Sequence, residues 1–275
     1  MRTTDERFAI VECRSCGICQ TFPQLSSEQA KNYYPAVYYP SLESSEHYYQ
    51  KTSHQFQADK IAKLGRFRKS GKLLDVGCGV GYFVLEAVRA HFDAEGLEFS
   101  PDAASVGREL WTLKIQTGDF LRAEYPEASF EIVTLWQVFE HFPNPVETLR
   151  KVWQILKPGG LLVVAVPNIA SIQASLFTNR WYHLDVPRHL FHYSPQTLGR
   201  LIEREGYQVK AVDYVSQEHN GAGVLGSVMR LWTPDELFIH KLIRKTIGRA
   251  IGNGLASIES LFKRGGTFTL FAEKK

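Results

Sequence analysis

Three glycines within nine residues form the clearest chemical signal in the sequence. The segment Leu73–Gly81 reads Leu-Leu-Asp-Val-Gly-Cys-Gly-Val-Gly, so an apolar run passes directly into a glycine-rich turn. Glycine lets the backbone approach a ligand more closely than any Cβ permits, and the N-terminus of a following helix favours anions. The pattern predicts a nucleotide-binding turn. Because Tyr82 replaces the third glycine of the fingerprint G-x-G-x-x-G, the spacing argues against a dehydrogenase.

Acidic residues follow the next two apolar runs. Glu98 ends the run Gly96-Leu97-Glu98, and Asp119 follows Gly118 after the run near Ile115. A carboxylate at such a position can accept hydrogen bonds from both hydroxyls of a ribose. Because ligands of open α/β sheets lie outside the carboxyl ends of the strands, we expect Asp75, Glu98 and Asp119 to converge on one crevice. A turn or a helix cap is the alternative role for each acid alone.

The elements that must position these residues can be read from hydrophobic periodicity. Apolar runs bounded by glycine alternate with apolar residues at helical spacing, which predicts a mainly parallel sheet covered on both faces. Two late strands joined by an insertion predict an antiparallel edge. Strands are expected at 73–76, 94–99, near 115, 132–135, 161–166, 207–215 and 267–272, and helices at 54–68, 82–90, 101–111, 146–156 and 195–205.

From about Gly71 to Lys275 the sequence resembles the class I S-adenosylmethionine-dependent methyltransferases. The matching segments are Leu73–Gly81 (first motif), Glu98 (ribose-binding acid), Gly118–Phe120 (adenine-binding segment), Phe130–Gln137 (fourth strand) and Leu156–Gly160 (turn before the fifth strand). The resemblance implies an α/β Rossmann-like, doubly wound, seven-stranded sheet, mostly parallel with an antiparallel last strand. It implies S-adenosylmethionine as cofactor. The implied cofactor-binding residues are Asp75, Gly77, Cys78, Gly79, Gly81, Glu98, Phe99, Asp119, Phe120 and Gln137.

A base is the next requirement if the acceptor is a hydroxyl or a carbon acid, because a neutral hydroxyl is a poor nucleophile. The nine histidines are densest in the segment Trp181–His192, in the loop that opens toward the transferred methyl in this fold. We expect His189 to be the acid/base or acceptor-orienting residue, with Tyr182 and His183 as further candidates. In the alternative interpretation, the segment is core and His189 satisfies a backbone carbonyl.

Glu140-His141 follows the fourth strand, where the resemblance places residues beside the methionine end of the cofactor or the acceptor. In some quinone-modifying relatives a comparable pair helps to bind a divalent metal. No further carboxylate lies close by in sequence. We therefore expect a helix-start network rather than a catalytic metal, with His141 kept as a candidate catalytic residue.

The first fifty residues differ from the rest and predict a small appendage, 1–50, ahead of a methyltransferase domain at 51–275. Cys13, Cys16 and Cys19 are candidate zinc ligands, since Cys-x-x-Cys with a following glycine is typical of half a zinc ribbon. A closed site needs four ligands, so a truncated or degenerate ribbon with reduced, locally packed cysteines is favoured over zinc. The tyrosine-rich stretch that follows is expected to form an irregular cover, with Tyr38 and Tyr39 as lid candidates.

A helical insertion is expected at about 216–264. Its stretch 235–262 carries an apolar stripe and a separate basic face, which suits an anionic membrane surface or a lipidic acceptor, whereas packing on its own domain or in a homodimer is the commoner outcome.

Composition limits the remaining function classes. The chain has 275 residues, 44% of them hydrophobic, with a net charge of +3, as expected for a soluble globular protein and too small a charge for a nucleic-acid binder. Gln137–Glu140 also lacks the Asn/Asp-Pro-Pro-aromatic tetrad of base-methylating relatives. Without a membrane span or a secretory signal, a cytoplasmic protein is expected.

The sequence therefore predicts an S-adenosylmethionine-dependent methyltransferase acting on a small or lipid-linked acceptor, such as a sugar nucleotide or a glycan intermediate. Oxygen is favoured over carbon as the acceptor atom. A quinone or phenolic O-methyltransferase is the alternative enzyme, and a non-catalytic cofactor-binding scaffold or regulator is the alternative from another class.

Overall fold

The computed structural model describes residues 6–25, 29, 33, 41–216, 218–230, 254 and 258–275. The chain divides into two compact units. Unit 1 comprises Met1–Tyr33, Ala165–Arg200 and Val212–Leu270, and unit 2 comprises Tyr34–Val164, Leu201–Ala211 and Phe271–Lys275. All of the predicted cofactor-binding residues belong to unit 2.

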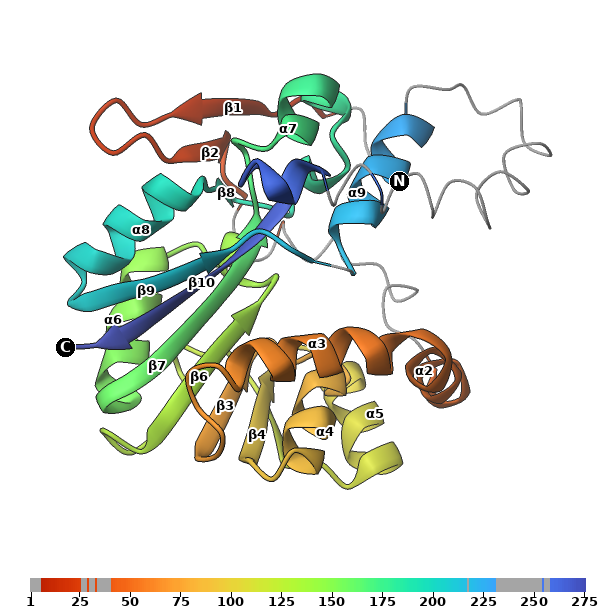
Figure 1. Cartoon of the computed structure of the whole chain (residues 1–275), viewed down its shortest axis with the longest axis vertical. Helices are drawn as coiled ribbons and strands as arrows, with labels where there is room; N and C mark the ends of the chain where they lie inside the picture. Colours follow the sequence, from red (N-terminus) through yellow and green to blue (C-terminus); the bar gives the residue numbers. More distant parts are fainter. Residues whose placement is uncertain are drawn as a thin grey trace. The chain divides into compact units, whose positions relative to one another are not determined.

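A seven-stranded sheet with the order β5-β4-β3-β6-β7-β10-β9 carries the fold. Its strands are β3 (Lys72–Val76), β4 (Asp93–Glu98), β5 (Ile115–Thr117), β6 (Phe130–Trp136), β7 (Leu156–Pro167), β9 (Tyr207–Asp213) and β10 (Thr267–Lys274). β3 pairs in parallel with β4 and β6, and β4 pairs in parallel with β5. β10 runs opposite to β6 (Figure 1). This is the mostly parallel sheet with an antiparallel last strand that the sequence predicts.

The helices of unit 2 cover both faces of this sheet. They are α2 (Leu42–Tyr48), the π-helix η2 (Tyr49–Ser53), α3 (His54–Leu64), α4 (Tyr82–Arg89), α5 (Pro101–Trp111), the 3-10 helix η3 (Phe139–His141) and α6 (Pro145–Ile155). α3 and α4 lie on one side of the sheet and α6 on the other (Figure 1). Leu64 of α3 and Phe83 of α4 belong to one buried core with Leu73, Ile132 and Phe271 of the strands.

Local sequence chemistry sets the ends of α5. The Ser100 side chain accepts a hydrogen bond from the amide of Ala103 at 3.3 Å, and Pro101 occupies the first helical turn, where its missing N–H costs nothing. Thr112 ends the helix in the left-handed region with φ of 55°. The helix therefore occupies the predicted range, Pro101–Trp111.

Unit 1 contains a three-stranded sheet of order β1-β2-β8. Its elements are β1 (Ala9–Glu12), β2 (Cys19–Phe22), α7 (Ile172–Phe177), η4 (Thr178–Arg180), η5 (Tyr182–Leu184), β8 (Phe191–His192) and α9 (Asn220–Met229); α8 (Pro195–Arg204) continues into unit 2. Antiparallel pairing joins Cys19 to His192, and the Thr21 hydroxyl donates to the carbonyl of His189 at 2.6 Å. The predicted appendage thus pairs with a segment about 170 residues downstream.

Two expectations need correction. Residues Leu42–Ser53 are helical rather than an irregular cover, because the Ser41 side chain caps α2 and the Tyr49 side chain is buried. β7 begins at Leu156 and not at Leu161, because the carbonyls of Leu156 and Gly159 accept hydrogen bonds from Lys274 and Arg68, which hold this stretch to its neighbours.

Some expectations remain predictions. The boundary expected between residues 50 and 51 falls inside η2, which continues α2 into α3. The lid candidates Tyr38 and Tyr39 and most of the basic helix 235–262 lie outside the described residues. Of the helices in the described part of the chain, none is long and apolar enough to cross a membrane.

Candidate active site

The glycine loop connects β3 to α4 in the conformation that its sequence demands. Gly77, Gly79 and Gly81 have φ values of 72°, 57° and 84°, in the left-handed region that side chains with a Cβ rarely adopt. A Cβ on Gly77 would lie 2.5 Å from Cγ2 of Val138, and one on Gly81 would lie 2.7 Å from Cδ1 of Leu113. Neither position can accept a larger residue without displacing the core.

Gly79 differs because a Cβ there would meet open space. The loop is held by β4, since the amides of Gly77 and Cys78 both donate to the carbonyl of Leu97, at 2.7 and 3.1 Å. At Gly79 the backbone therefore faces a space that a bound molecule can enter, while the hydrogen bonds to Leu97 of β4 fix the conformation of the loop.

Glu98, at the end of β4, is tied to this loop. One carboxylate oxygen accepts from the amide of Gly79 and the other from the amide of Ser100, each at 2.8 Å. The residue is 8% exposed. Each carboxylate oxygen can accept a further hydrogen bond, so Glu98 can bind a pair of hydroxyls while it stays fixed in place.

Asp119, Phe120 and Phe99 complete the group that follows β4 and β5. The Asp119 carboxylate accepts from the amide of Leu121 at 2.9 Å, and its side chain is 43% exposed. Phe120 is buried, whereas Phe99 is 66% exposed, which is unusual for an aromatic ring beside a loop of this kind. Phe99 can stack on a flat ring and Asp119 can accept its N–H groups.

Asp75 ends β3 as a fully enclosed carboxyl group. Its Oδ1 accepts from the hydroxyl of Thr134 at 2.7 Å. Burial raises the pKa of Asp75 to about 7, although the Thr134 hydrogen bond and the charge of Lys60 both oppose that rise. Asp75 is thus held beneath the loop, where it faces β6 and not solvent.

This raised pKa gives a testable pH dependence. In an unfolded chain the pKa of an aspartate is about 3.9, so between about pH 4 and pH 7 only the folded protein binds this proton. The contribution of Asp75 to the free energy of unfolding is fully present below about pH 4, and it is lost as the pH rises from there through 7. The Asp75→Asn variant has no carboxyl group to ionise at this position. From pH 4.5 to pH 8 we therefore expect the melting temperature of the variant to rise relative to that of the natural protein.

Thermal unfolding at both pH values measures this effect. The exposed Asp102→Asn variant is the control, since its carboxylate is already in water. A melting-temperature difference for Asp75→Asn that is equal at the two pH values would contradict the burial argument.

After β6 the backbone turns sharply. Gln137 has φ of 53°, and Glu140 and His141 lie in the 3-10 helix Phe139–His141, with Glu140 buried. The amide of His141 donates to the carbonyl of Val138 at 3.0 Å. The pair thus ends a short 3-10 helix and lies ahead of α6, which begins at Pro145, so the expected helix-start network stays a prediction. Val138 also packs against Gly77 of the loop.

The other catalytic candidates belong to unit 1. His189 is 7% exposed, and its Nδ1 lies 2.9 Å from the carbonyl of His183, to which it must donate because a carbonyl only accepts. Its Nε2 lies 3.7 Å from the Asp185 carboxylate. The bond to a backbone carbonyl matches the alternative interpretation of His189, and in the neutral ring it leaves the lone pair on Nε2.

His183 and Tyr182 have different surroundings. Burial, with the nearby His219 and Arg230, lowers the pKa of His183 to about 3, so this ring stays neutral and is a weak base. Its Nε2 donates to the carbonyl of His219 at 3.0 Å. Tyr182 is 44% exposed, and the Arg230 guanidinium lies over its ring at 5.2 Å. Of these two, only Tyr182 presents its side chain to solvent.

The cysteines form a turn without forming a complete metal centre. The amide of Gly17 donates to the carbonyl of Cys13, and amides of Ser15 and Cys16 lower the pKa of the Cys13 thiol. Burial raises the pKa of Cys19. Within residues 6–25 the three sulfurs do not converge as ligands of one ion would. In the described part of the chain these three cysteines therefore do not form the four-ligand set of a closed zinc site.

Sequence reasoning missed Ser100 and Val138 as parts of the loop's support. Ser100 holds Glu98 through its backbone amide and also caps α5. The pattern Ser-Pro-Asp after a strand signals the cap, whereas nothing in the sequence signals that Val138 packs on Gly77.

Comparison with known proteins identifies the family to which this chain belongs. A family model described as a methyltransferase domain matches residues 47–212, more than half of the chain. Demethylmenaquinone methyltransferase of Deinococcus radiodurans is 33% identical over 126 residues, which are 42% of this chain and 52% of that protein. Ubiquinone biosynthesis O-methyltransferase of Xanthomonas euvesicatoria is 28% identical over 155 residues, 51% of this chain and 64% of that protein. The chain spans about half of the length of the demethylmenaquinone methyltransferases that it matches.

Solved structures agree on the fold. A SAM-dependent methyltransferase from Archaeoglobus fulgidus superposes with a TM-score of 0.58 at 18% identity, over 86% of this chain and 100% of that one. A SAM-dependent methyltransferase from Thermotoga maritima, titled a possible histamine N-methyltransferase, gives 0.57 at 16% identity, over 85% and 96%. The chain belongs to the methyltransferase-domain family and has the Rossmann-like fold of class I S-adenosylmethionine-dependent methyltransferases.

Proposed function

We propose that the protein transfers a methyl group from S-adenosylmethionine to a small-molecule acceptor, with oxygen favoured over carbon as the acceptor atom. The observation that carries this proposal is the fixed Glu98 carboxylate beside the open backbone of Gly79. A hydroxyl-binding acid next to a glycine turn suits a nucleoside with both ribose hydroxyls intact.

The same residues suggest how the cofactor is held. Glu98 accepts the ribose hydroxyls, the exposed ring of Phe99 stacks on the adenine, and Asp119 accepts from its amino group. Gly79 allows the methionine portion to pass close to the backbone. The sulfonium is already activated, so orientation of the acceptor supplies much of the remaining rate enhancement.

In this proposal His189 is the acid/base residue. The hydrogen bond from its Nδ1 to the carbonyl of His183 fixes the ring, so that Nε2 can take the proton of an acceptor hydroxyl. His183 serves as a neutral support because burial keeps its pKa low. Tyr182 and His141 are further candidates for contact with the acceptor.

Two acceptor classes are candidates. A sugar nucleotide or a lipid-linked glycan intermediate is the acceptor expected from the sequence. A quinone or phenolic precursor is the second, supported by the names of the relatives from Deinococcus radiodurans and Xanthomonas euvesicatoria. A sugar and a phenolic precursor each offer a hydroxyl that a base can deprotonate.

Calorimetric titration with S-adenosylhomocysteine and with NAD tests the cofactor, and radiolabelled S-adenosylmethionine with the two acceptor classes tests turnover. We expect micromolar binding of S-adenosylhomocysteine, no binding of NAD, and transfer to one class. His189→Asn should keep cofactor binding and lose about 100-fold or more in rate. Absence of binding would overturn the proposal, and binding without transfer to either class would favour a non-catalytic scaffold.

A further inference from the structure

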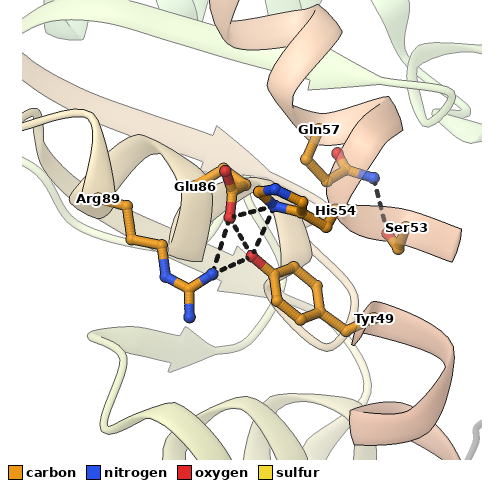
Figure 2. Close-up of polar contacts among 6 residues, drawn as sticks. All are labelled: Tyr49, Ser53, His54, Gln57, Glu86 and Arg89. Atoms are coloured by element: carbon orange, nitrogen blue, oxygen red, sulfur yellow. Dashed lines mark hydrogen bonds and ion pairs between the residues drawn. The ribbon is translucent and has the colours of Figure 1, made fainter. Parts of the chain in front are cut away.

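Four side chains join the helical segment Leu42–Leu64 to α4 (Figure 2). The Tyr49 hydroxyl donates to the Glu86 carboxylate, and Nη1 of Arg89 lies 2.5 Å from the Tyr49 oxygen and 3.1 Å from Oε1 of Glu86. Nδ1 of His54 lies 3.2 Å from the same carboxylate oxygen. A single oxygen of Glu86 therefore gathers groups from η2, α3 and α4.

The two central residues of this network, Tyr49 and Glu86, are buried, whereas the side chains of His54 and Arg89 are each 53% exposed. Tyr49 is 4% exposed and Glu86 is 7% exposed. Burial raises the pKa of Tyr49, so it remains a neutral donor. Burial alone would raise the pKa of Glu86, but hydrogen bonds from Tyr49, His54 and Arg89 outweigh it and the pKa is lowered. A neutral donor faces a charged acceptor, which is the stronger kind of hydrogen bond.

The network also reaches the glycine loop. Tyr82 is the first residue of α4 and follows Gly81 directly. Its ring stacks on that of Tyr49, with centroids 5.8 Å apart and an interplanar angle of 19°, and its hydroxyl donates to the carbonyl of Ser45 at 3.3 Å. The segment Leu42–Leu64 thus contacts Tyr82, the residue that follows the loop, through both its ring and its hydroxyl.

The local backbone adds a reason to regard this contact as functional. Tyr49 begins the π-helix Tyr49–Ser53, which lies between α2 and α3. π-helical turns are rare, and they are frequently found at functional sites. Here the turn brings Tyr49 and His54 onto the same carboxylate.

We propose that Tyr49 and Glu86 are positioning residues, which hold the segment Leu42–Leu64 against α4 and through Tyr82 keep the glycine loop in its cofactor-binding conformation. The claim about the glycine loop rests on the proposed function. The claim that Tyr49 and Glu86 hold the segment Leu42–Leu64 against α4 does not depend on any ligand.

Tyr49→Phe tests the proposal because it removes only the hydroxyl and keeps the ring stacked on Tyr82. The matched control is Tyr207→Phe, which removes another buried tyrosine hydroxyl of unit 2, one that donates to the carbonyl of Leu149 at 2.7 Å. Amide hydrogen exchange of residues 42–53 and calorimetric titration with S-adenosylhomocysteine are measured on both variants and on the natural protein.

We expect Tyr49→Phe to speed exchange in residues 42–53 and to weaken S-adenosylhomocysteine binding, each by about tenfold, because a hydrogen bond to a charged group is lost. Tyr207→Phe should change neither, whatever its melting temperature. Glu86→Gln, which keeps an acceptor oxygen for Tyr49, should fall between Tyr49→Phe and the natural protein.

Unchanged exchange in Tyr49→Phe would overturn the proposal, and so would faster exchange with unchanged cofactor affinity, since the segment would then open without affecting the loop. If the natural protein fails to bind S-adenosylhomocysteine, the proposed function fails, while the exchange comparison still decides whether Tyr49 holds the segment.

Discussion

Replacing Glu98 with alanine is expected to weaken S-adenosylhomocysteine binding by about 100-fold or more. In the proposed complex the carboxylate accepts two ribose hydroxyls, and each charge-assisted hydrogen bond contributes about 1.5–3 kcal/mol. Loss of about 3 kcal/mol corresponds to about 100-fold in affinity. The amides of Gly79 and Ser100 also lose their acceptor, so the loop itself becomes less well fixed.

Glu98→Gln is a sharper variant of the same test. Both carboxylate oxygens already accept from backbone amides, so the amide nitrogen of glutamine would face an N–H donor at either position. The isosteric variant should therefore not restore binding. Calorimetric titration measures both variants.

Glu109→Ala is the control for these variants, since Glu109 lies on the exposed face of α5, where its carboxylate accepts a hydrogen bond from the Ser105 hydroxyl at 3.0 Å. Its binding should equal that of the natural protein. Full affinity in Glu98→Ala would mean that the nucleoside is held elsewhere.

The second large effect is expected at the glycine loop, where Gly77→Ala should lower the melting temperature much more than Gly79→Ala does. An alanine at 77 combines left-handed strain of about 1–2 kcal/mol with overpacking of about 1–3 kcal/mol against Val138. The sum, about 2–5 kcal/mol, corresponds to roughly 4–20 °C in a chain of this size.

Gly79→Ala separates the effect of backbone strain from the effect of steric overlap with neighbouring side chains. Its Cβ meets nothing in the protein, so only the left-handed strain remains, but the methyl group protrudes where the cofactor is proposed to lie. We expect a small fall in melting temperature with a large loss of S-adenosylhomocysteine affinity. Scanning calorimetry and titration on both variants distinguish the two effects.

Val138→Ala supplies the check on Gly77→Ala. If the side chain of Val138 causes the clash, the double variant Gly77→Ala/Val138→Ala should regain part of the stability that Gly77→Ala loses, in a non-additive way. Purely additive losses would show that Val138 is not the obstacle.

Much of the fold was predictable because its signals are local. The glycine turn, the range of α5 and the apolar runs of β3, β4 and β6 depend on neighbouring residues, and they lie close to where the sequence places them. The irregular cover expected in the first fifty residues was wrong from Leu42 on, because nothing in this polar, tyrosine-rich sequence indicates that Tyr49 is buried. Tyr49 becomes part of the core through contacts with residues distant in sequence, among them Tyr82 and Trp111.

By itself, then, the sequence determined the alternating strands and helices, the glycine loop and the identity of the acids that follow the strands, since chain geometry within a few residues imposes these features. Tertiary structure alone decided that Glu98 binds the amides of Gly79 and Ser100, that burial raises the pKa of Asp75, and that Tyr49 meets Glu86 across 37 residues. Hydrogen-bond partners and desolvation depend on which distant segments pack together, and no local pattern records that choice.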